Sequence, residues 1–414
     1  MERFANATEA ALKLRPDEPV YCFRPEILKG DARRFMEMFP GKTAYAVKTN
    51  GEPLVLKTLV EAGVDCFDVA SPAEFAAVRA VSDTAELIYM HPVKAQSHIR
   101  LALEDYGIRT TVIDHEDELA KIVRVVKALD LDPGAITVFV RIATKGEAAY
   151  ELSKKFGCGP AQAVELLQRL HRTGFRTGLC FHVGSQIEDP DVYDAALKSA
   201  DWVRNRAAVP LAALDVGGGF PADYGHEPER KLDDMPSLPQ LMSRVRGDLA
   251  EWGFLRMPLV AEPGRVIVAR AFSLLVRVML RKGRRLYIND GIWASLSDSW
   301  TGKIALPARF IPDPAIRQRN GDENEIVPFR VCGATCDSVD ILSRPFYLPE
   351  TIDTGDWIEI GHIGAYSMSL RTRFNGFYPD RFVEVTTPFD EGGMPHGFVS
   401  LETMAGRMAG LASV

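Results

Sequence analysis

Several polar residues stand directly after short apolar runs, and one of them has the chemistry of a nucleophile. Lys48 ends the run AYAVK (residues 44–48) and is followed by Thr49 and Asn50. A lysine that is desolvated at the end of a buried strand can have a lowered pKa and attack an aldehyde through its neutral amine. The same lysine could equally form a structural ion pair or lie in solvent. Lys48 is therefore a candidate for covalent chemistry with two plainer alternatives.

A glycine triplet ends another apolar run. Gly217, Gly218 and Gly219 follow Asp215 and Val216. Adjacent glycines let backbone N–H groups approach a phosphate closely, although such triplets also occur in ordinary turns. The segment lacks the spacing of a dinucleotide fingerprint and the lysine of a P-loop. It indicates a phosphate cradle only in combination with other residues.

Two further runs end in a carboxylate and in an imidazole. Glu262 begins the segment EPGR, in which Arg265 could pair with a phosphate or simply with Glu262 itself. His182, in FHVGS, could stack on a planar ligand while Ser185 offers a hydroxyl. A lone strand histidine is more often a core residue with satisfied hydrogen bonds. Each of these signals is weak by itself.

Together the candidate groups match the needs of one cofactor. An amine, a glycine-rich phosphate cradle, an arginine, a flat stacking group and a carboxylate are what pyridoxal phosphate requires. The carboxylate would keep the pyridine nitrogen protonated, so that the ring accepts electrons. The pattern therefore favours an enzyme that uses pyridoxal phosphate.

These residues can meet only if the runs that carry them belong to one sheet. Helical periodicity lies between strand-like runs, as in residues 53–63, 72–81 and 161–174, the last with a glycine suited to a helix C-cap. The eight strand-like runs are residues 43–48, 66–70, 87–90, 110–114, 136–142, 178–184, 213–219 and 258–264. Eight βα units favour a TIM (β/α)8 barrel, in which chemistry gathers at the C-terminal ends of the strands.

After residue 265 the pattern changes to strands without intervening helices. The runs are residues 266–281, 284–290, 325–333, 356–361 and 381–387. We therefore expect an α/β protein with three parts: residues 1–36 packing with the second domain, a cofactor-binding barrel at 37–265, and a mostly β domain at 266–414. The tail from residue 388 has loop composition and then a weakly helical end, and it predicts no function.

Composition limits the class of protein. The chain has 414 residues, 46% of them hydrophobic and 25% charged, which is typical of a globular protein of two domains. We expect it in the cytoplasm and not in a membrane, because it shows no signal peptide and no long apolar run. Its six scattered cysteines predict neither a metal site nor a disulfide framework. A net charge of −7 disfavours nucleic acid and is mildly compatible with a cationic substrate.

The sequence resembles the fold-type III pyridoxal-phosphate decarboxylases, the family of ornithine, diaminopimelate and arginine decarboxylases, and within it most closely the ornithine decarboxylases. Ten matches fall in the family's order across residues 45–377. They are YAVKTN, VRIAT, LSKKFG, FHVGSQ, DVGGGFP, AEPGR, INDG, CGATCDSVD, GAYS and FNGF. The resemblance implies an alanine racemase-like fold, a barrel followed by a β domain.

The resemblance also assigns the cofactor-binding residues. It implies that Lys48 holds pyridoxal phosphate as a Schiff base, with Asp68 and Arg141 at the cofactor's edge. His182 would stack on the ring and take part in catalysis, and Glu262 would bond the pyridine nitrogen. The phosphate side would be bound by Ser185, Gly218, Gly219, Gly264, Arg265 and Tyr366.

The family builds its active sites across a homodimer, so the CDSVD segment would reach the partner subunit's site. Cys336 would be the proton donor to Cα after CO₂ is lost, and Asp337 would bind the distal ammonium of the substrate. Asp290 is the second suspected ammonium ligand. No metal ligand is implied.

Substrate class follows from the charge at the far end of the site. Relatives that act on diaminopimelate carry Glu after the corresponding Cys and an arginine shortly after the INDG match, whereas this chain has Asp337 and no arginine in residues 291–300. A distal ammonium is therefore favoured, with ornithine converted to putrescine as the first candidate.

Departures from the family pattern leave lysine or a modified diamino acid open. They are His91 where the family usually has Asn, Ala334 where Pro is common, and residues 296–303. An amino-acid racemase and an inactive regulator of the antizyme-inhibitor type are further alternatives. The racemases carry an arginine in place of Glu262, and the inactive regulators have a decayed cofactor site.

Overall fold

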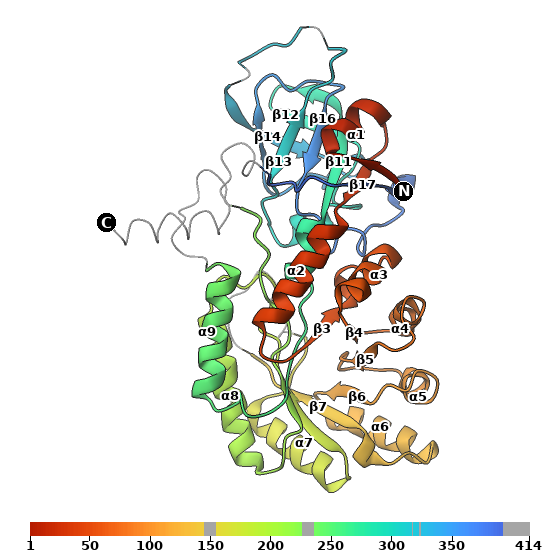
Figure 1. Ribbon diagram of the computed structural model, residues 1–414, viewed down its shortest axis with the longest axis vertical. Coiled ribbons are helices and arrows are strands. Elements are labelled where there is room, and N and C mark those ends of the chain that lie inside the picture. The colour runs from red at the N-terminus through yellow and green to blue at the C-terminus, as the bar shows by residue number, and fades with distance from the viewer. Residues whose placement is uncertain (145–154, 226–235, 317, 323, 392–414) are drawn as a thin grey trace, which may run out of the picture. The chain divides into compact units, whose positions relative to one another are not determined.

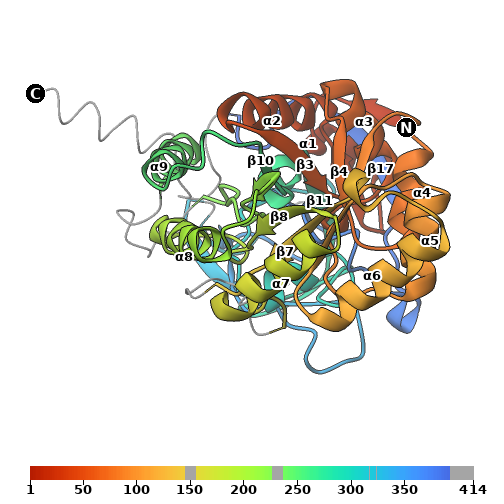
Figure 2. The ribbon, with the colours of Figure 1, turned by 90° about the horizontal axis from the view of Figure 1, so that it is seen from below.

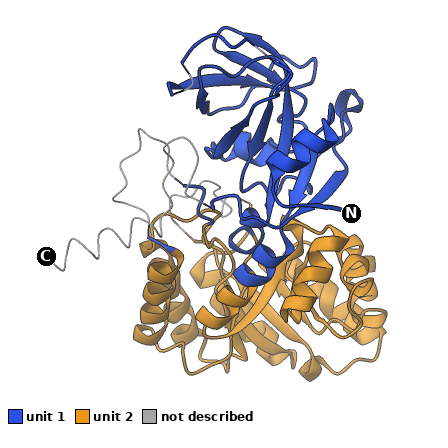
Figure 3. Cartoon of the chain, turned by 45° about the horizontal axis from the view of Figure 1, so that its top comes forward, with its two compact units in different colours: residues 1–31, 222–237, 265–414 blue, residues 32–221, 238–264 orange. Residues whose placement is uncertain are grey.

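The chain forms two compact units, coloured separately in Figure 3. The computed structural model describes residues 1–144, 155–225, 236–316, 318–322 and 324–391. Unit 1 comprises Met1–Asp31, Ala222–Ser237 and Arg265–Val414, and unit 2 comprises Ala32–Pro221 and Leu238–Gly264. These ranges differ from the expected parts in two places. The first boundary lies inside helix α2 (Pro25–Met38), and a segment between the last two barrel strands is grouped with unit 1.

Unit 2 is a closed parallel barrel of eight strands, which confirms the predicted TIM barrel (Figures 1 and 2). The strands are β3 (Lys42–Ala46), β4 (Cys66–Val69), β5 (Glu86–Tyr89), β6 (Thr110–Ile113), β7 (Thr137–Arg141), β8 (Arg176–Cys180), β9 (Ala213–Asp215) and β10 (Leu259–Ala261). Pairing of β10 with β3, in the register Val260 to Lys42, closes the barrel. Most strands end earlier than predicted, so several candidate site residues lie in the loops just after them.

Helices surround the barrel strands, as Figure 2 shows. They are α3 (Pro53–Ala62), α4 (Pro72–Arg79), α5 (Gln96–Glu104), α6 (Glu116–Ala128), α7 (Pro160–Arg172), α8 (Asp191–Ala207) and α9 (Leu238–Glu251). Local signals set their ends. The Ser71 side chain accepts from the Glu74 backbone N–H at the start of α4, proline begins α3, α4 and α7, and Gly63, with φ of 102°, ends α3.

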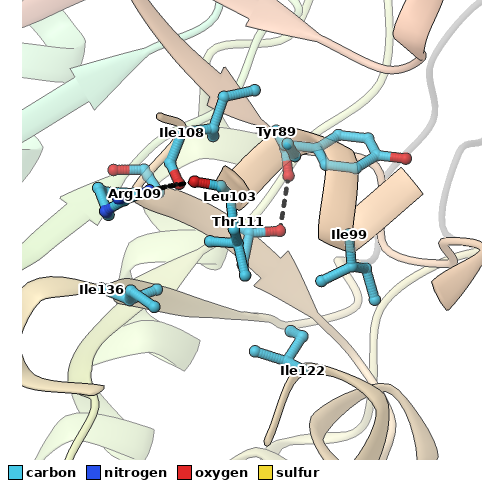
Figure 4. A pocket seen from close by; sticks show the side chains of 10 residues that line it. Tyr89, Ile99, Leu103, Ile108, Arg109, Thr111, Ile122 and Ile136 are labelled. Carbon is cyan, nitrogen blue, oxygen red and sulfur yellow. Dashed lines mark hydrogen bonds between the residues drawn. The ribbon is translucent and has the colours of Figure 1, made fainter. Parts of the chain in front are cut away.

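The barrel is packed both inside and under its helices. Small and apolar side chains fill the interior, among them Ala44, Cys66, Ile88, Met90, Val112, Phe139, Cys180 and Ala213. A small cavity of ≈ 10 Å³, about the space of one water, lies among residues of β5, β6, α5 and α6 (Figure 4). Most of its lining residues are apolar, and the Thr111 hydroxyl donates to the Tyr89 carbonyl at 3.0 Å. The cavity therefore has the character of a packing gap.

Unit 1 is mostly β, as predicted. One path of its sheet runs β1-β17-β2-β11-β12-β14-β15, and β16 pairs with both β11 and β13. The strands are β1 (Glu2–Phe4), β2 (Val20–Phe23), β11 (Phe272–Lys282), β12 (Arg285–Ile288), β13 (Ala308–Ile311), β14 (Ile326–Cys332), β15 (Phe346–Pro349), β16 (Trp357–Ile360) and β17 (Arg381–Val385). The N-terminal strands join this sheet because β1 pairs with β17 and β2 pairs with β11.

Short helices complete unit 1. Helix α1 (Ala7–Leu14) buries its alanine face against the sheet in a core that includes Trp357. Helix α11 (Ser297–Thr301) is a single turn.

The predicted strand at 266–281 is wrong in its first third. Helix α10 (Arg265–Val268) and the 3-10 turn Ala269–Ala271 precede β11. These residues are nearly all apolar and buried, and a continuous apolar run does not reveal whether it is strand or buried helix. Gly364 packs directly on this turn, since a Cβ there would lie 1.9 Å from the Val268 carbonyl oxygen.

Among the residues described, no helix has the length and apolar character that a membrane span requires. The last part of the predicted tail, residues 392–414, lies outside the described residues.

Candidate active site

Lys48 lies in a 3-10 turn, Val47–Thr49, directly after β3 rather than in the strand itself. Its Nζ donates to Asp68 Oδ2 on the neighbouring strand β4 at 3.2 Å. Asp68 is buried, but the Lys48 side chain is 44% exposed. Nearly half of the Lys48 side chain is thus open to solvent in the chain alone. The ion pair weighed as an alternative is present, and it holds the amine at the C-terminal end of the barrel.

Two buried carboxyl groups lie at the ends of β9 and β10. Asp215 is fully buried, and its Oδ1 accepts from the Gly217 N–H at 2.7 Å. Its Oδ2 accepts no hydrogen bond from the part of the chain that the structure describes. Burial raises the pKa of Asp215 to about 7, and burial followed by the charges of Asp215 and Asp68 raises the pKa of Glu262 well above its usual value. Each of these two carboxyl groups therefore keeps its proton to a higher pH than an ordinary Asp or Glu side chain does.

His182 lies two residues beyond β8 and is held by its own loop. The Gly184 N–H donates to Nδ1 at 3.2 Å, and the Thr144 hydroxyl donates to the His182 carbonyl at 3.0 Å. Burial, then the charges of Arg141 and Lys48, lower the pKa of His182 well below its usual value. The imidazole is consequently neutral and flat, which suits stacking on a ring.

The glycines leave main chain exposed where side chains could not fit. A Cβ on Gly218 would lie 2.7 Å from the Glu262 carbonyl oxygen and 3.0 Å from His182 Nε2. A Cβ on Gly264 would lie 2.0 Å from Thr49 Oγ1. Gly219 has a φ of 103°, which favours glycine. The ends of β3, β8, β9 and β10 thus approach one another through backbone, as a phosphate cradle built from N–H groups requires.

Arg265 forms hydrogen bonds with residues of unit 1. Its guanidinium forms a bidentate pair with Asp298, with Nη1 to Oδ2 at 2.6 Å and Nη2 to Oδ1 at 3.1 Å, and Nη1 also donates to the Tyr224 hydroxyl. It lies 5.0 Å from the centre of the Tyr366 ring. The Glu262–Arg265 pair weighed from the sequence is therefore replaced by Arg265–Asp298, with Tyr366 beside it.

The loop that carries Cys336 and Asp337 is held from two sides. The Cys336 N–H donates to Asn375 Oδ1 at 3.0 Å, and its side chain is exposed. Asp337 accepts from Trp293 Nε1 at 3.2 Å and from the Val339 N–H at 3.0 Å. The thiol and the carboxylate are thus presented together on one ordered turn.

Asp290, the second suspected ammonium ligand, is buried and already accepts hydrogen bonds from the chain. It is 1% exposed, and its oxygens accept from the Gly291 N–H, the Ser295 N–H and the Ser295 hydroxyl at 2.7 to 2.9 Å. Burial raises the pKa of Asp290 to about 7. A role in binding substrate stays a prediction.

Comparison with known proteins decides the family. Residues 27–269 match the family model described as "Pyridoxal-dependent decarboxylase, pyridoxal binding domain". The chain is 31% identical to the lysine/ornithine decarboxylase of Selenomonas ruminantium, over 81% of each chain. It is also 31% identical to the ornithine decarboxylase of Mus musculus, over 83% of this chain and 75% of the relative.

A solved structure agrees. The arginine decarboxylase of Paramecium bursaria Chlorella virus superposes with a TM-score of 0.77 at 26% identity, covering 93% of this chain and all of the other. The chain belongs to the pyridoxal-dependent decarboxylases. The predicted family, enzyme class and cofactor are thereby confirmed.

The described residues of this decarboxylase fit the cofactor. The barrel brings together an amine, a neutral imidazole and a carboxyl group. Its backbone is open at Gly218 and Gly264, where any side chain would clash with neighbouring atoms. A cationic ring nitrogen would also offset the repulsion among the buried carboxyl groups.

The predicted site residues are divided between the two units. In unit 2 the set is Lys48, Asp68, Arg141, His182, Ser185, Gly218, Gly219, Glu262 and Gly264, and in unit 1 it is Arg265, Asp290, Cys336, Asp337 and Tyr366. The first three residues of the LSKKFG match lie outside the described residues.

Reasoning from the sequence missed four carboxyl or indole groups that organise these sets: Asp215, Trp293, Asp298 and Asp340. Asp215 could have been found, because a carboxylate at the end of an apolar run is the same signal that identified Glu262. The other three reveal themselves only through contacts distant in sequence.

Replacing Asp215 by Asn should flatten the pH dependence of stability in the cofactor-free decarboxylase. A carboxyl group whose pKa is raised on folding stabilises below its unfolded pKa, and this contribution is lost as pH rises through the folded value. With a folded pKa of about 7, Asp215 can contribute a loss of up to about 1.4 kcal/mol per pH unit between pH 5 and 7. Denaturant unfolding at pH 5, 6, 7 and 8 measures it.

The exposed Asp83→Asn variant is the control for removing one carboxylate. The change of its unfolding free energy with pH should match that of the wild type. Equal slopes in the wild type and Asp215→Asn would show that Asp215 holds no proton.

Proposed function

We propose that this enzyme removes the α-carboxylate of a basic L-amino acid, with ornithine as the leading substrate and putrescine as the product. The carrying observation is the Asp337 carboxylate, which is partly buried and oriented by Trp293 and the Val339 N–H beside the Cys336 thiol. A carboxylate suits a distal ammonium, and residues 291–300 contain no arginine for a distal carboxylate.

The printed activities of the relatives support a basic substrate without separating the candidates. One acts on lysine and ornithine, one on ornithine and one on arginine. One methylene of chain length is worth only about 1–3 kcal/mol of discrimination. Lysine, arginine and a modified diamino acid therefore stand as alternatives to ornithine.

In this proposal the residues that the resemblance assigns to the cofactor bind and orient it. Lys48 binds its aldehyde carbon, and Asp68 and Arg141 lie at its edge. His182 stacks on its ring without adding charge, and Glu262 holds a proton on the pyridine nitrogen. Ser185, Gly218, Gly219, Gly264, Arg265 and Tyr366 bind the phosphate. Pyridoxal phosphate, when bound, accepts the electron pair that the departing carboxylate leaves on Cα.

The remaining steps belong to the loop of unit 1. Asp337 binds the distal ammonium and so fixes the substrate along the site, with Asp290 as a second candidate ligand. The bond between Cα and the carboxylate carbon breaks and CO₂ leaves. The Cys336 Sγ–H then gives its proton to Cα. The thiolate regains a proton from solvent, and Lys48 would replace the product amine on the cofactor, which restores the starting state.

We also propose a cytoplasmic homodimer in which this loop serves the partner subunit. Large apolar side chains are exposed around the loop, with Val339 at 47%, Phe374 at 45% and Phe377 at 39%. The Cys336–Asn375 hydrogen bond joins the loop to the segment of the two phenylalanines. An exposed apolar patch of this kind is typical of an interface with another chain.

The two other functions considered from the sequence are less well supported. A racemase would place an arginine near the pyridine nitrogen, whereas this chain has a carboxyl group at Glu262 with a raised pKa. An inactive regulator would have lost cofactor-binding residues, whereas every expected position is filled in the sequence.

Substrate assays test the proposal directly. CO₂ release from ornithine, lysine, arginine and diaminopimelate, measured side by side, should be fastest for ornithine and negligible for diaminopimelate. Asp337→Asn should raise KM for ornithine roughly 10- to 100-fold, since charge-assisted hydrogen bonds contribute about 1.5–3 kcal/mol. The exposed Asp380→Asn variant is the matched control. Rapid decarboxylation of diaminopimelate would overturn the substrate assignment.

Lys48→Ala should abolish covalent attachment of pyridoxal phosphate and reduce CO₂ release by several orders of magnitude. Borohydride reduction followed by mass spectrometry of peptides locates the attachment. Lys42→Ala, at the opposite end of β3 and paired with Glu86 in the surface, should behave as the wild type. Full activity of Lys48→Ala with cofactor attached elsewhere contradicts the assignment.

Mixing two inactive variants tests the shared site. Lys48→Ala and Cys336→Ala should each be nearly inactive, and their mixture should recover up to about a quarter of wild-type activity, because random pairing leaves half of the dimers with one intact site. Refolding each variant alone is the control. If the mixture stays inactive while forming mixed dimers, each subunit uses its own loop.

A further inference from the structure

We propose that unit 1 carries a second ligand site, a pocket for a small oxyanion between strands β12 and β14. We call it the anion pocket. It is a cavity of ≈ 290 Å³ whose lining includes Arg285, Tyr287, Arg330, Thr335 and Ser338. Asp337, the proposed ligand of the substrate ammonium, also lines this pocket, but the anion pocket is inferred from its arginines and not from the proposed substrate.

The sheet register places two arginines side by side. β12 and β14 pair in parallel, with Arg285 opposite Arg330 and Tyr287 opposite Cys332. Because side chains alternate along a strand, these four residues share one face, and all four line the pocket. Like charges directly opposite one another destabilise a sheet. A bound anion would remove this repulsion.

Neither guanidinium has a counterion within the described part of the chain. No hydrogen bond or ion pair of the Arg285 or Arg330 side chain is found there. The neighbouring Arg284 shows the contrast, because it projects to the opposite face and pairs with Glu350, Nη2 to Oε1 at 3.0 Å. Arg284 therefore has a carboxylate partner within the chain, whereas Arg285 and Arg330 line the cavity.

The carboxylates that line the pocket are already engaged elsewhere. Asp340 is 2% exposed and accepts from the Thr335 N–H, the Thr335 hydroxyl and the Ile292 N–H. Asp337 accepts from Trp293 and from the Val339 N–H. The donors that remain for a ligand are the two guanidinium groups and the hydroxyls of Tyr287 and Ser338.

This set of donors selects an oxyanion. Guanidinium groups bind carboxylate and phosphate oxygens in a bidentate fork, and hydroxyls complete the shell. The volume approaches the lower limit of about 300 Å³ for small-molecule pockets. The ligand is therefore a compact anion with several oxygens, either inorganic phosphate or a small polycarboxylate.

Calorimetric titration of the cofactor-loaded enzyme tests the pocket. Saturating pyridoxal phosphate keeps the cofactor's own phosphate site filled. Inorganic phosphate is titrated in one arm and citrate in the other, at constant ionic strength set with NaCl. The wild type should bind at least one of them. Arg285→Gln and Arg330→Gln should each bind it at least tenfold more weakly, and the double variant should not bind measurably.

Arg284→Gln is the matched control, because it removes the same charge from the adjacent position on the other face. It should bind as the wild type does. Arg285→Lys and Arg330→Lys keep the charge but lose the bidentate fork, so they should bind with intermediate affinity, and they keep the test valid if a glutamine variant does not fold.

Three results would overturn the proposal. They are the absence of binding to the wild type, equal binding by the wild type and the Arg285→Gln/Arg330→Gln variant, and equal weakening by Arg284→Gln. Dissociation of the double variant into monomers, without anion binding by the wild type, would instead assign the two arginines to carboxylates of a second copy of the chain.

Discussion

Closure of the barrel between β10 and β3 is the constraint on which the cofactor site depends. The polar residues that follow the barrel strands are separated by up to about 200 positions in sequence, yet closure puts the ends of all eight parallel strands on one rim. Glu262 follows β10 directly, Asp215 ends β9, and Lys48 follows β3. Three consecutive strands of the closed ring thus deliver two carboxyl groups and an amine to the same place.

The same closure creates the electrostatic problem that defines the site. Asp68, Asp215 and Glu262 are all less than 9% exposed, and the charges near them come from Lys48 and Arg141. Burial of several carboxylates costs free energy unless some of them keep a proton or gain a cationic partner. The chain alone adopts the first solution, since the pKa values of Asp215 and Glu262 are raised. In the proposed function the pyridinium nitrogen of the cofactor would supply the second, and the unfavourable pair of carboxyl groups would then favour cofactor binding.

The sequence predicted the barrel well because its signals are local. Apolar runs, intervening helical periodicity and polar residues at strand ends identify each βα unit without knowledge of its neighbours. It did not reveal hydrogen bonds that form only in the folded chain, such as those of Asp290 with Ser295 and of Arg265 with Asp298. Residues 266–271 failed for a different reason, because an apolar run buried on all sides is compatible with both helix and strand.

Asp340 orders the loop of unit 1 that carries Cys336 and Asp337, although no helix or strand includes these two residues. Its carboxylate accepts from both polar groups of Thr335 and from the Ile292 N–H, and thereby fixes the turn that starts at Gly333. Gly291 and Gly333 are required there, since a Cβ on either would lie within 2.3 Å of Asp340 Oδ1. The INDG and CGATCDSVD matches are therefore one structural device: two glycines admit the carboxylate, and the carboxylate orders the loop. Asp340 is 2% exposed and accepts from the Thr335 N–H, so it holds the turn next to Cys336 and Asp337.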